Sequence, residues 1–166
     1  MKIIKISSGL SSISSDAFAQ AKQFVDEAFG KGTFYKQACD DGTYQWLVVN
    51  GDGIITGYCS AQIHQVGLVG VLKTSVVHPD FRKNGIGDLM VKHRIKWLQE
   101  QNVQIIKCYA WFVNGVVPAQ KMLINNGFEP WGDIHGYWNK DHNWDYPCSV
   151  CGTNCKCVAR IFQYKG

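Results

Sequence analysis

The segment Val76-Val77-His78-Pro79-Asp80-Phe81-Arg82-Lys83-Asn84-Gly85-Ile86-Gly87 decides how this sequence is interpreted. A Val-rich run ends where the segment starts, a loop with two glycines follows, and a helical pattern begins at its end. The first N–H groups of a helix have no intrahelical partner and the helix dipole makes that end positive, so this junction suits a phosphate. Arg82 and Lys83 add positive charge, and Gly85 and Gly87 let a ligand approach the backbone. Gly-x-Gly alone is weak evidence, because an ordinary turn uses the same residues.

Hydrophobic periodicity on both sides of this junction predicts alternating strands and helices. A hairpin is expected at Asn50-Gly51-Asp52-Gly53, between two β-rich runs. The predicted strands cover residues 2–6, 44–49, 54–63, 67–77, 103–112, 128–138 and 158–164. The predicted helices cover residues 16–29, 87–101 and 118–126. This order indicates an α/β or α+β protein with one mixed central sheet.

Length and composition set the class of protein. A chain of 166 residues argues for a single domain over 1–166, with a Cys-rich loop at 148–157 between the last two strands. The net charge of +4 favours anionic ligands but is too small and too scattered to indicate nucleic-acid binding. No run reaches the roughly 18 apolar residues that a membrane span needs. The N-terminus lacks the apolar stretch of a signal peptide, so a cytoplasmic location is expected.

Four features, in the right order, resemble the GNAT N-acetyltransferases. The Arg-x-x-Gly-x-Gly run at 82–87 is similar to the coenzyme A loop of that family. The segment 50–57 is similar to its hairpin, Asn114 matches its Asn after the next strand, and 119–128 is similar to its helix ending in Gly-Phe. The resemblance implies the acyl-CoA N-acyltransferase fold, with a mostly antiparallel sheet of about seven strands flanked by helices.

The same resemblance implies an activity and a set of site residues. The chain would move an acetyl group from acetyl-CoA to a primary amine by direct attack, and the N–H of Val77 would stabilise the oxyanion. Asn114 would contact the pantetheine or the far end of the cofactor. The pantetheine would pair with the backbone of Ser75, Val76 and Val77. The pyrophosphate would be held by backbone N–H groups of Arg82, Lys83, Asn84, Gly85, Ile86 and Gly87.

The groups that would move protons depart from the family pattern. Many members have a Tyr acid where this chain has Leu123, and the strand at 67–77 has no Asp or Glu that could act as base. His135 is the most attractive base by its ordinary pKa, and Tyr109 is a second candidate. Tyr137, Asp133, Cys108 and a water chain to bulk solvent stay open, as does a His135 with no catalytic role.

A cysteine cluster lies between the last two predicted strands. Its spacing, Cys148-x2-Cys151-x3-Cys155-x-Cys157, would allow four thiolates to surround one Zn²⁺, although the second pair is tighter than a zinc knuckle normally has. An iron–sulfur cluster, a disulfide and reactive free thiols are the alternatives.

Two other functions remain open at this stage. A non-catalytic acyl-CoA-binding or regulatory module with a metal-stabilised loop would keep the same cofactor loop, and a metal-dependent interaction domain is a third interpretation. The sequence does not name the amine acceptor, which could be an aminoglycoside, a polyamine, an amino acid, a protein N-terminus or a lysine. It also leaves a homodimer open.

Overall fold

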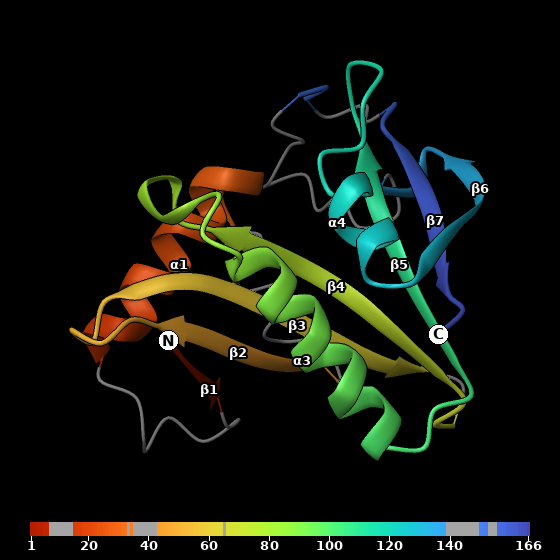
Figure 1. Cartoon of the computed structure of the whole chain (residues 1–166). Helices are drawn as coiled ribbons and strands as arrows, with labels where there is room; N and C mark the ends of the chain where they lie inside the picture. Colours follow the sequence, from red (N-terminus) through yellow and green to blue (C-terminus); the bar gives the residue numbers. More distant parts are fainter. Residues whose placement is uncertain (7–14, 33, 35–42, 65, 139–149, 153–155) are drawn as a thin grey trace.

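In the computed structural model, seven strands form one sheet in the order β1-β2-β3-β4-β5-β7-β6 (Figure 1). The structure describes residues 1–6, 15–32, 34, 43–64, 66–138, 150–152 and 156–166. The strands are β1 (Lys2–Ile6), β2 (Thr43–Val49), β3 (Ile55–His64), β4 (Val69–Val77), β5 (Ile105–Phe112), β6 (Phe128–His135) and β7 (Val158–Tyr164). The helices are α1 (Ser15–Phe29), α3 (Ile86–Glu100), α4 (Gln120–Asn125) and the short 3₁₀ helix η1 (Pro79–Phe81). The β4–β5 pair is parallel and the other pairs are antiparallel, which confirms the predicted fold class.

The local elements follow the sequence pattern with two differences. Pro79 starts η1, which was not predicted; His78 Nδ1 accepts a 3.4 Å hydrogen bond from the N–H of Asp80 and caps it. The last predicted strand before the cysteines ends at His135 instead of Trp138, because the chain turns at Gly136 with φ of 63°.

Alternation along β3 divides the core between the two faces of the sheet. Cys59 and Ala61 belong to the cluster that packs against α3, and Tyr58 belongs to the cluster that packs against α1. The helices therefore cover opposite faces, and α3 crosses the front of β3 and β4 in Figure 1. Within the described ranges, no helix is both long enough and apolar enough to span a membrane.

Candidate active site

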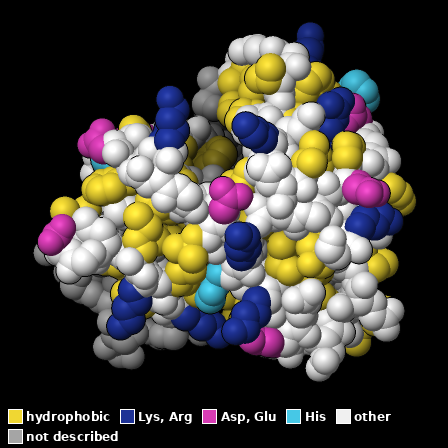
Figure 2. Space-filling view, in the orientation of Figure 1, with side chains coloured by type: hydrophobic (Ala, Val, Ile, Leu, Met, Phe, Trp, Pro, Cys, Tyr) yellow, Lys and Arg dark blue, Asp and Glu magenta, His cyan; other side chains and the backbone are white. Residues whose placement is uncertain are grey.

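The sheet opens where β4 and β5 separate. The two strands pair from Val69 with Ile105 only as far as Leu72 with Cys108. Beyond that point β4 keeps its pairing with β3, whereas β5 pairs with β7. The strands diverge in Figure 1, and in Figure 2 the surface is hollowed between the end of β4 and the part formed by β5 and α4, with Lys or Arg side chains on the rim. This opening is the candidate site.

The edge of β4 that borders the opening has no strand partner among the described residues. The N–H of His78 donates to Thr56 O at 2.9 Å, so the next pair, Val77 with Gly57, is of the non-hydrogen-bonded kind. The N–H and C=O of Val77, and of Ser75 two residues earlier, therefore point to the side that β5 has left. Val76 directs its backbone groups toward β3 instead, so of the three residues expected to pair with a pantetheine arm, Ser75 and Val77 have the right orientation.

The loop that follows β4 connects this strand edge to the first turn of α3. Gly85 caps the helix in the left-handed region, with φ of 74°, and makes no side-chain cap hydrogen bond. Lys83 is also left-handed, with φ of 65°. Residues 82–85 are exposed, whereas Ile86, the first residue of α3, is buried. The first N–H groups of α3 have no partner within the helix.

Arg82 closes the loop on itself rather than offering its amide to a ligand. Its N–H donates to Pro79 O at 3.3 Å, and its Nε donates to Val77 O at 3.2 Å. The amides left for an anion are therefore those of residues 83–87. The carbonyl of Val77 is occupied, and only its N–H remains directed into the opening.

Asn114 lies in a tight turn beyond the end of β5. Val113 and Val116 exchange two backbone hydrogen bonds of 3.0 Å, and Asn114 and Gly115 between them have φ of 50° and 80°. Asn-Gly is the favoured pair for such a turn, so the turn alone explains this exposed asparagine.

The two main proton-transfer candidates, Tyr109 and His135, lie at different distances from the opening. Tyr109 directly follows Cys108, the last β5 residue paired with β4, and its ring stacks on Tyr137 with centroids 4.8 Å apart. His135 is exposed at the end of β6, and β7 separates β6 from β5. Tyr109 is thus next to the opening, and His135 is on the far strand of the sheet.

The other proton-transfer candidates are engaged elsewhere. Asp133 accepts two 2.8 Å hydrogen bonds from Arg160, which lower the pKa of its carboxyl. Burial raises the pKa of the Cys108 thiol to about 11, which does not suit a base at neutral pH. Leu123 is 1% exposed on α4 and belongs to the core beside α3.

The predicted zinc site is not confirmed. Cys148 and Cys155 lie outside the described residues. Cys151 Sγ and Cys157 Sγ are 3.4 Å apart, with no disulfide between them. No group of three or more His, Cys, Asp or Glu suited to a metal ion occurs in the described part of the chain.

Sequence reasoning missed Arg94, which is 1% exposed under the point where β4 leaves β5. The available signal was its position, since it follows Met90 by four residues and precedes Leu98 by four. It therefore falls within the apolar stripe of its helix, although it carries a charge.

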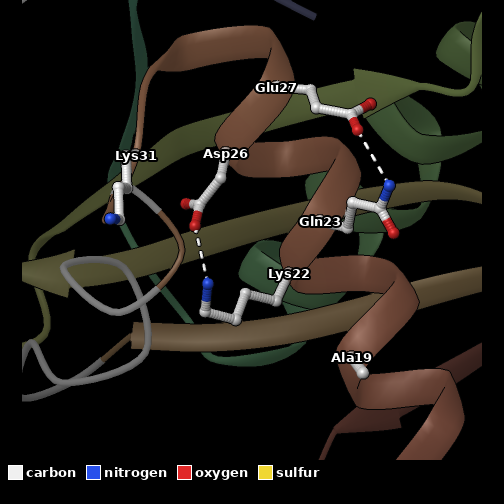
Figure 3. Close-up of a pocket in the computed structure, with 6 residues that line it drawn as sticks. All are labelled: Ala19, Lys22, Gln23, Asp26, Glu27 and Lys31. Carbon is white, nitrogen blue, oxygen red and sulfur yellow. Dashed lines mark hydrogen bonds and ion pairs between the residues drawn. The ribbon is translucent and has the colours of Figure 1, made fainter.

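A second depression, on the outer surface of α1, has no feature of a catalytic centre (Figure 3). A Lys22–Asp26 ion pair of 2.9 Å and a Gln23–Glu27 hydrogen bond of 2.9 Å line it. Both join residues four apart along one helix, which is ordinary surface chemistry.

Solved structures with a similar fold are acetyltransferases. The Gcn5 structure from Tetrahymena has a TM-score of 0.68 at 10% identity, covering 99% of this chain and 95% of that chain. The ribosomal-protein-S18-alanine N-acetyltransferase from Escherichia coli has a TM-score of 0.65 at 15% identity, covering 98% and 93%. A GNAT family acetyltransferase from Elizabethkingia anophelis, with acetyl-CoA bound, has a TM-score of 0.65 at 16% identity, covering 99% and 97%.

Comparisons of the sequence gave one match, to a family model. No curated protein sequence matches this chain. The family model described as the acetyltransferase (GNAT) family matches residues 11–128, which include β4, the exposed loop and α3. With the sheet that opens between β4 and β5, this match shows that the chain belongs to the GNAT acetyltransferase family.

Proposed function

We propose that the chain transfers an acetyl group from acetyl-CoA to a primary amine. The observation that carries this proposal is the edge of β4 at Ser75 and Val77, which has no strand partner on the side of β5 in the described part of the chain and leads to the first turn of α3, where the N-cap Gly85 offers no side-chain acceptor. An extended chain with hydrogen-bonding groups fits the strand edge, and a diphosphate fits the helix start. Pantetheine pyrophosphate, the central part of acetyl-CoA, has both features in this order.

The reaction needs little from the protein beyond placement. The amine nitrogen attacks the thioester carbonyl carbon, the carbon–sulfur bond breaks, the thiolate leaves, and the nitrogen loses one proton. Holding the reactants together supplies most of the acceleration, and the N–H of Val77 is the proposed donor to the developing negative charge on the carbonyl oxygen. The thiol resembles free Cys, with a pKa of about 8.5, so its departure needs no strong acid.

We propose Tyr109 and His135 as the groups that exchange protons with the reactants. Tyr109 is favoured by its place directly after the last β4–β5 pair, and His135 by its residue type, since histidine is the side chain that most often acts as a general acid or base. A phenol beside the opening would also supply the acid that Leu123 cannot.

Thiol release is the measurement that tests this function. Purified protein is incubated with acetyl-CoA and a panel of polyamines, aminoglycosides, amino acids and peptides with free N-termini or lysines, and the free CoA is titrated. We expect release that depends on both the enzyme and one class of amine. Coenzyme A binding without release for any amine would instead indicate a non-catalytic acyl-CoA-binding module.

A further inference from the structure

Arg94 places a positive charge inside the core beneath the opening. It lies on the face of α3 that packs against the sheet, and its side chain is among the largest fully buried ones in the described part of the chain. None of the ion pairs among the described residues involves it. A buried charge is costly unless dipoles or counter-charges compensate it, so its contacts must explain its presence.

The groups that Arg94 contacts lie at a β-bulge in β4. Cys59 pairs with Ser75 and Ala61 pairs with Leu72, so two residues of β4, Lys73 and Thr74, face the single Ser60 of β3. Leu72 is also the last β4 residue paired with β5. The bulge therefore lies at the point where the sheet opens.

Arg94 donates hydrogen bonds to both strands at the bulge. Ser60 and Thr74 would form a regular hydrogen-bonded pair, but the N–H of Thr74 donates to Ser60 Oγ at 3.2 Å instead. The carbonyls of these two residues accept from Nη1 of Arg94, Ser60 O at 3.0 Å and Thr74 O at 3.3 Å. A planar guanidinium can serve both at once, whereas an ammonium on a flexible stem is less well oriented.

Arg94 also contacts the first residue of the free edge. Its Nη2 donates to Ser75 Oγ at 2.6 Å, and its Nε donates back to Met90 O at 3.1 Å, which fixes the guanidinium on its own helix. One side chain thus joins α3, the bulge and the start of the strand edge that ends at Val77.

We infer that Arg94 is a positioning residue for acetyl transfer, because it fixes the bulge and so sets the position of the Ser75 and Val77 amides relative to β5. This inference rests on the proposed function. Arg94 is too deeply buried to touch a reactant, so it acts through the strand. Its loss should affect the turnover step more than coenzyme A affinity, most of which the loop at 83–87 supplies.

The test compares Arg94→Gln and Arg94→Lys with the wild type. For Arg94→Gln we expect kcat to fall roughly 10- to 100-fold, the range for a misplacement of about 1 Å, while the Kd for coenzyme A by calorimetry changes less than about threefold. Arg94→Lys keeps the positive charge but loses the planar guanidinium that donates to several acceptors at once. Its kcat should lie between those of the wild type and Arg94→Gln.

Two controls separate positioning from stability and from charge. Leu98→Ala opens a cavity on the same helix against Gly70, away from the bulge, and should lower Tm without changing kcat well below that Tm. Lys92→Met removes an exposed charge from the same helix and should change neither. If Arg94→Gln keeps kcat within about threefold of the wild type, or loses no more than Leu98→Ala does, the inference is overturned.

A third variant decides the case in which Arg94→Gln does not fold. Ser75→Ala removes the 2.6 Å acceptor but no charge, and we expect it to lower kcat several-fold at unchanged coenzyme A affinity. Unchanged kcat in Ser75→Ala would overturn the inference. Failure of the proposed function looks different, because the wild-type chain itself would then release no thiol.

Discussion

A methyl group on the Cα of Gly87 would lie 2.6 Å from the Sδ atom of Met122. The packing of Met122 against the first turn of α3 therefore leaves no room for a larger residue at Gly87 unless Met122 moves. Asn126 strengthens this contact by donating from Nδ2 to Asp88 Oδ1 at 2.7 Å. The loop at 83–87 is thus held from the side of α4.

This contact predicts a coupling between Gly87 and Met122. Gly87→Ala should lower the free energy of unfolding by about 1 kcal/mol, since Met122 must move to admit the methyl group. In a Met122→Ala background the same change should be neutral or stabilising by up to about 1 kcal/mol, because alanine has the higher helix propensity. Urea unfolding of the four proteins measures this, and strictly additive effects would contradict the packing explanation.

Gly85 should matter for its backbone conformation rather than for space. Its φ is 74°, and a Cβ there would meet no atom within 4 Å. Gly85→Ala should weaken coenzyme A binding about tenfold, since a left-handed alanine costs roughly 1–2 kcal/mol, and Gly85→Asn should weaken it less. Gly53 is the matched control, because it has φ of 82° and open space in the β2–β3 hairpin. Calorimetry should find coenzyme A affinity unchanged in Gly53→Ala, and an equal loss in both alanine variants would refute this role of the loop.

Tyr109 should contribute more to turnover than His135. Tyr109→Phe keeps the ring that stacks on Tyr137 but removes the hydroxyl beside the opening. We expect kcat to fall by about 100-fold, within the range for a general acid or base, and by a smaller factor in His135→Ala. Rates measured from pH 6 to 10 would also show which variant loses a limb of the profile. The reverse order of losses would assign the proton transfer to His135.

The Asp133–Arg160 pair predicts an acid-sensitive contact between β6 and β7. Because Arg160 lowers the pKa of Asp133 below its ordinary value of 3.8, the unfolded chain binds this proton more readily. The stabilisation is present above the ordinary pKa and is lost as pH falls through the lower folded value. Asp133→Asn should therefore flatten the dependence of Tm on pH between about 5 and 2. Glu129→Gln, an exposed carboxylate on the same strand, is the control, and equal slopes in Asp133→Asn and the wild type would argue against the pair.

The order of elements was predictable because each carries its own local signal. The Asn-Gly turn at 50–51 and the switch to helical period after Gly85 mark the boundaries of β2, β3 and α3. Local signals do not say which strands pair, so the insertion of β7 between β5 and β6 was not predicted. β7 pairs with the edge of β5 that faces away from β4, and this pairing continues along β5 beyond Cys108, where the pairing with β4 ends.

The candidate site was predictable where it depends on backbone geometry and not where it depends on tertiary contacts. The loop at 83–87 could be identified from Gly spacing and a resemblance. The inward charge of Arg94 was missed although its position in the apolar stripe indicated it, because a charged residue is normally assigned to the exposed face of a helix. Asn114 is a different case, since the turn gives it a local structural reason and its contact with the cofactor stays a prediction.

The short parallel contact between Val69–Leu72 and Ile105–Cys108 makes the two halves of the sheet neighbours along a narrow seam. The packing of α3 against α4 also joins the two halves, through contacts such as Met122 with Gly87. A ligand bound between the separated ends of β4 and β5 would hydrogen-bond to the backbone of β4 and contact β5. It would therefore link the two halves of the sheet. Ligand binding in the opening should then slow amide hydrogen exchange in β5 and β7, even though most of the proposed hydrogen bonds to the ligand come from β4 and α3.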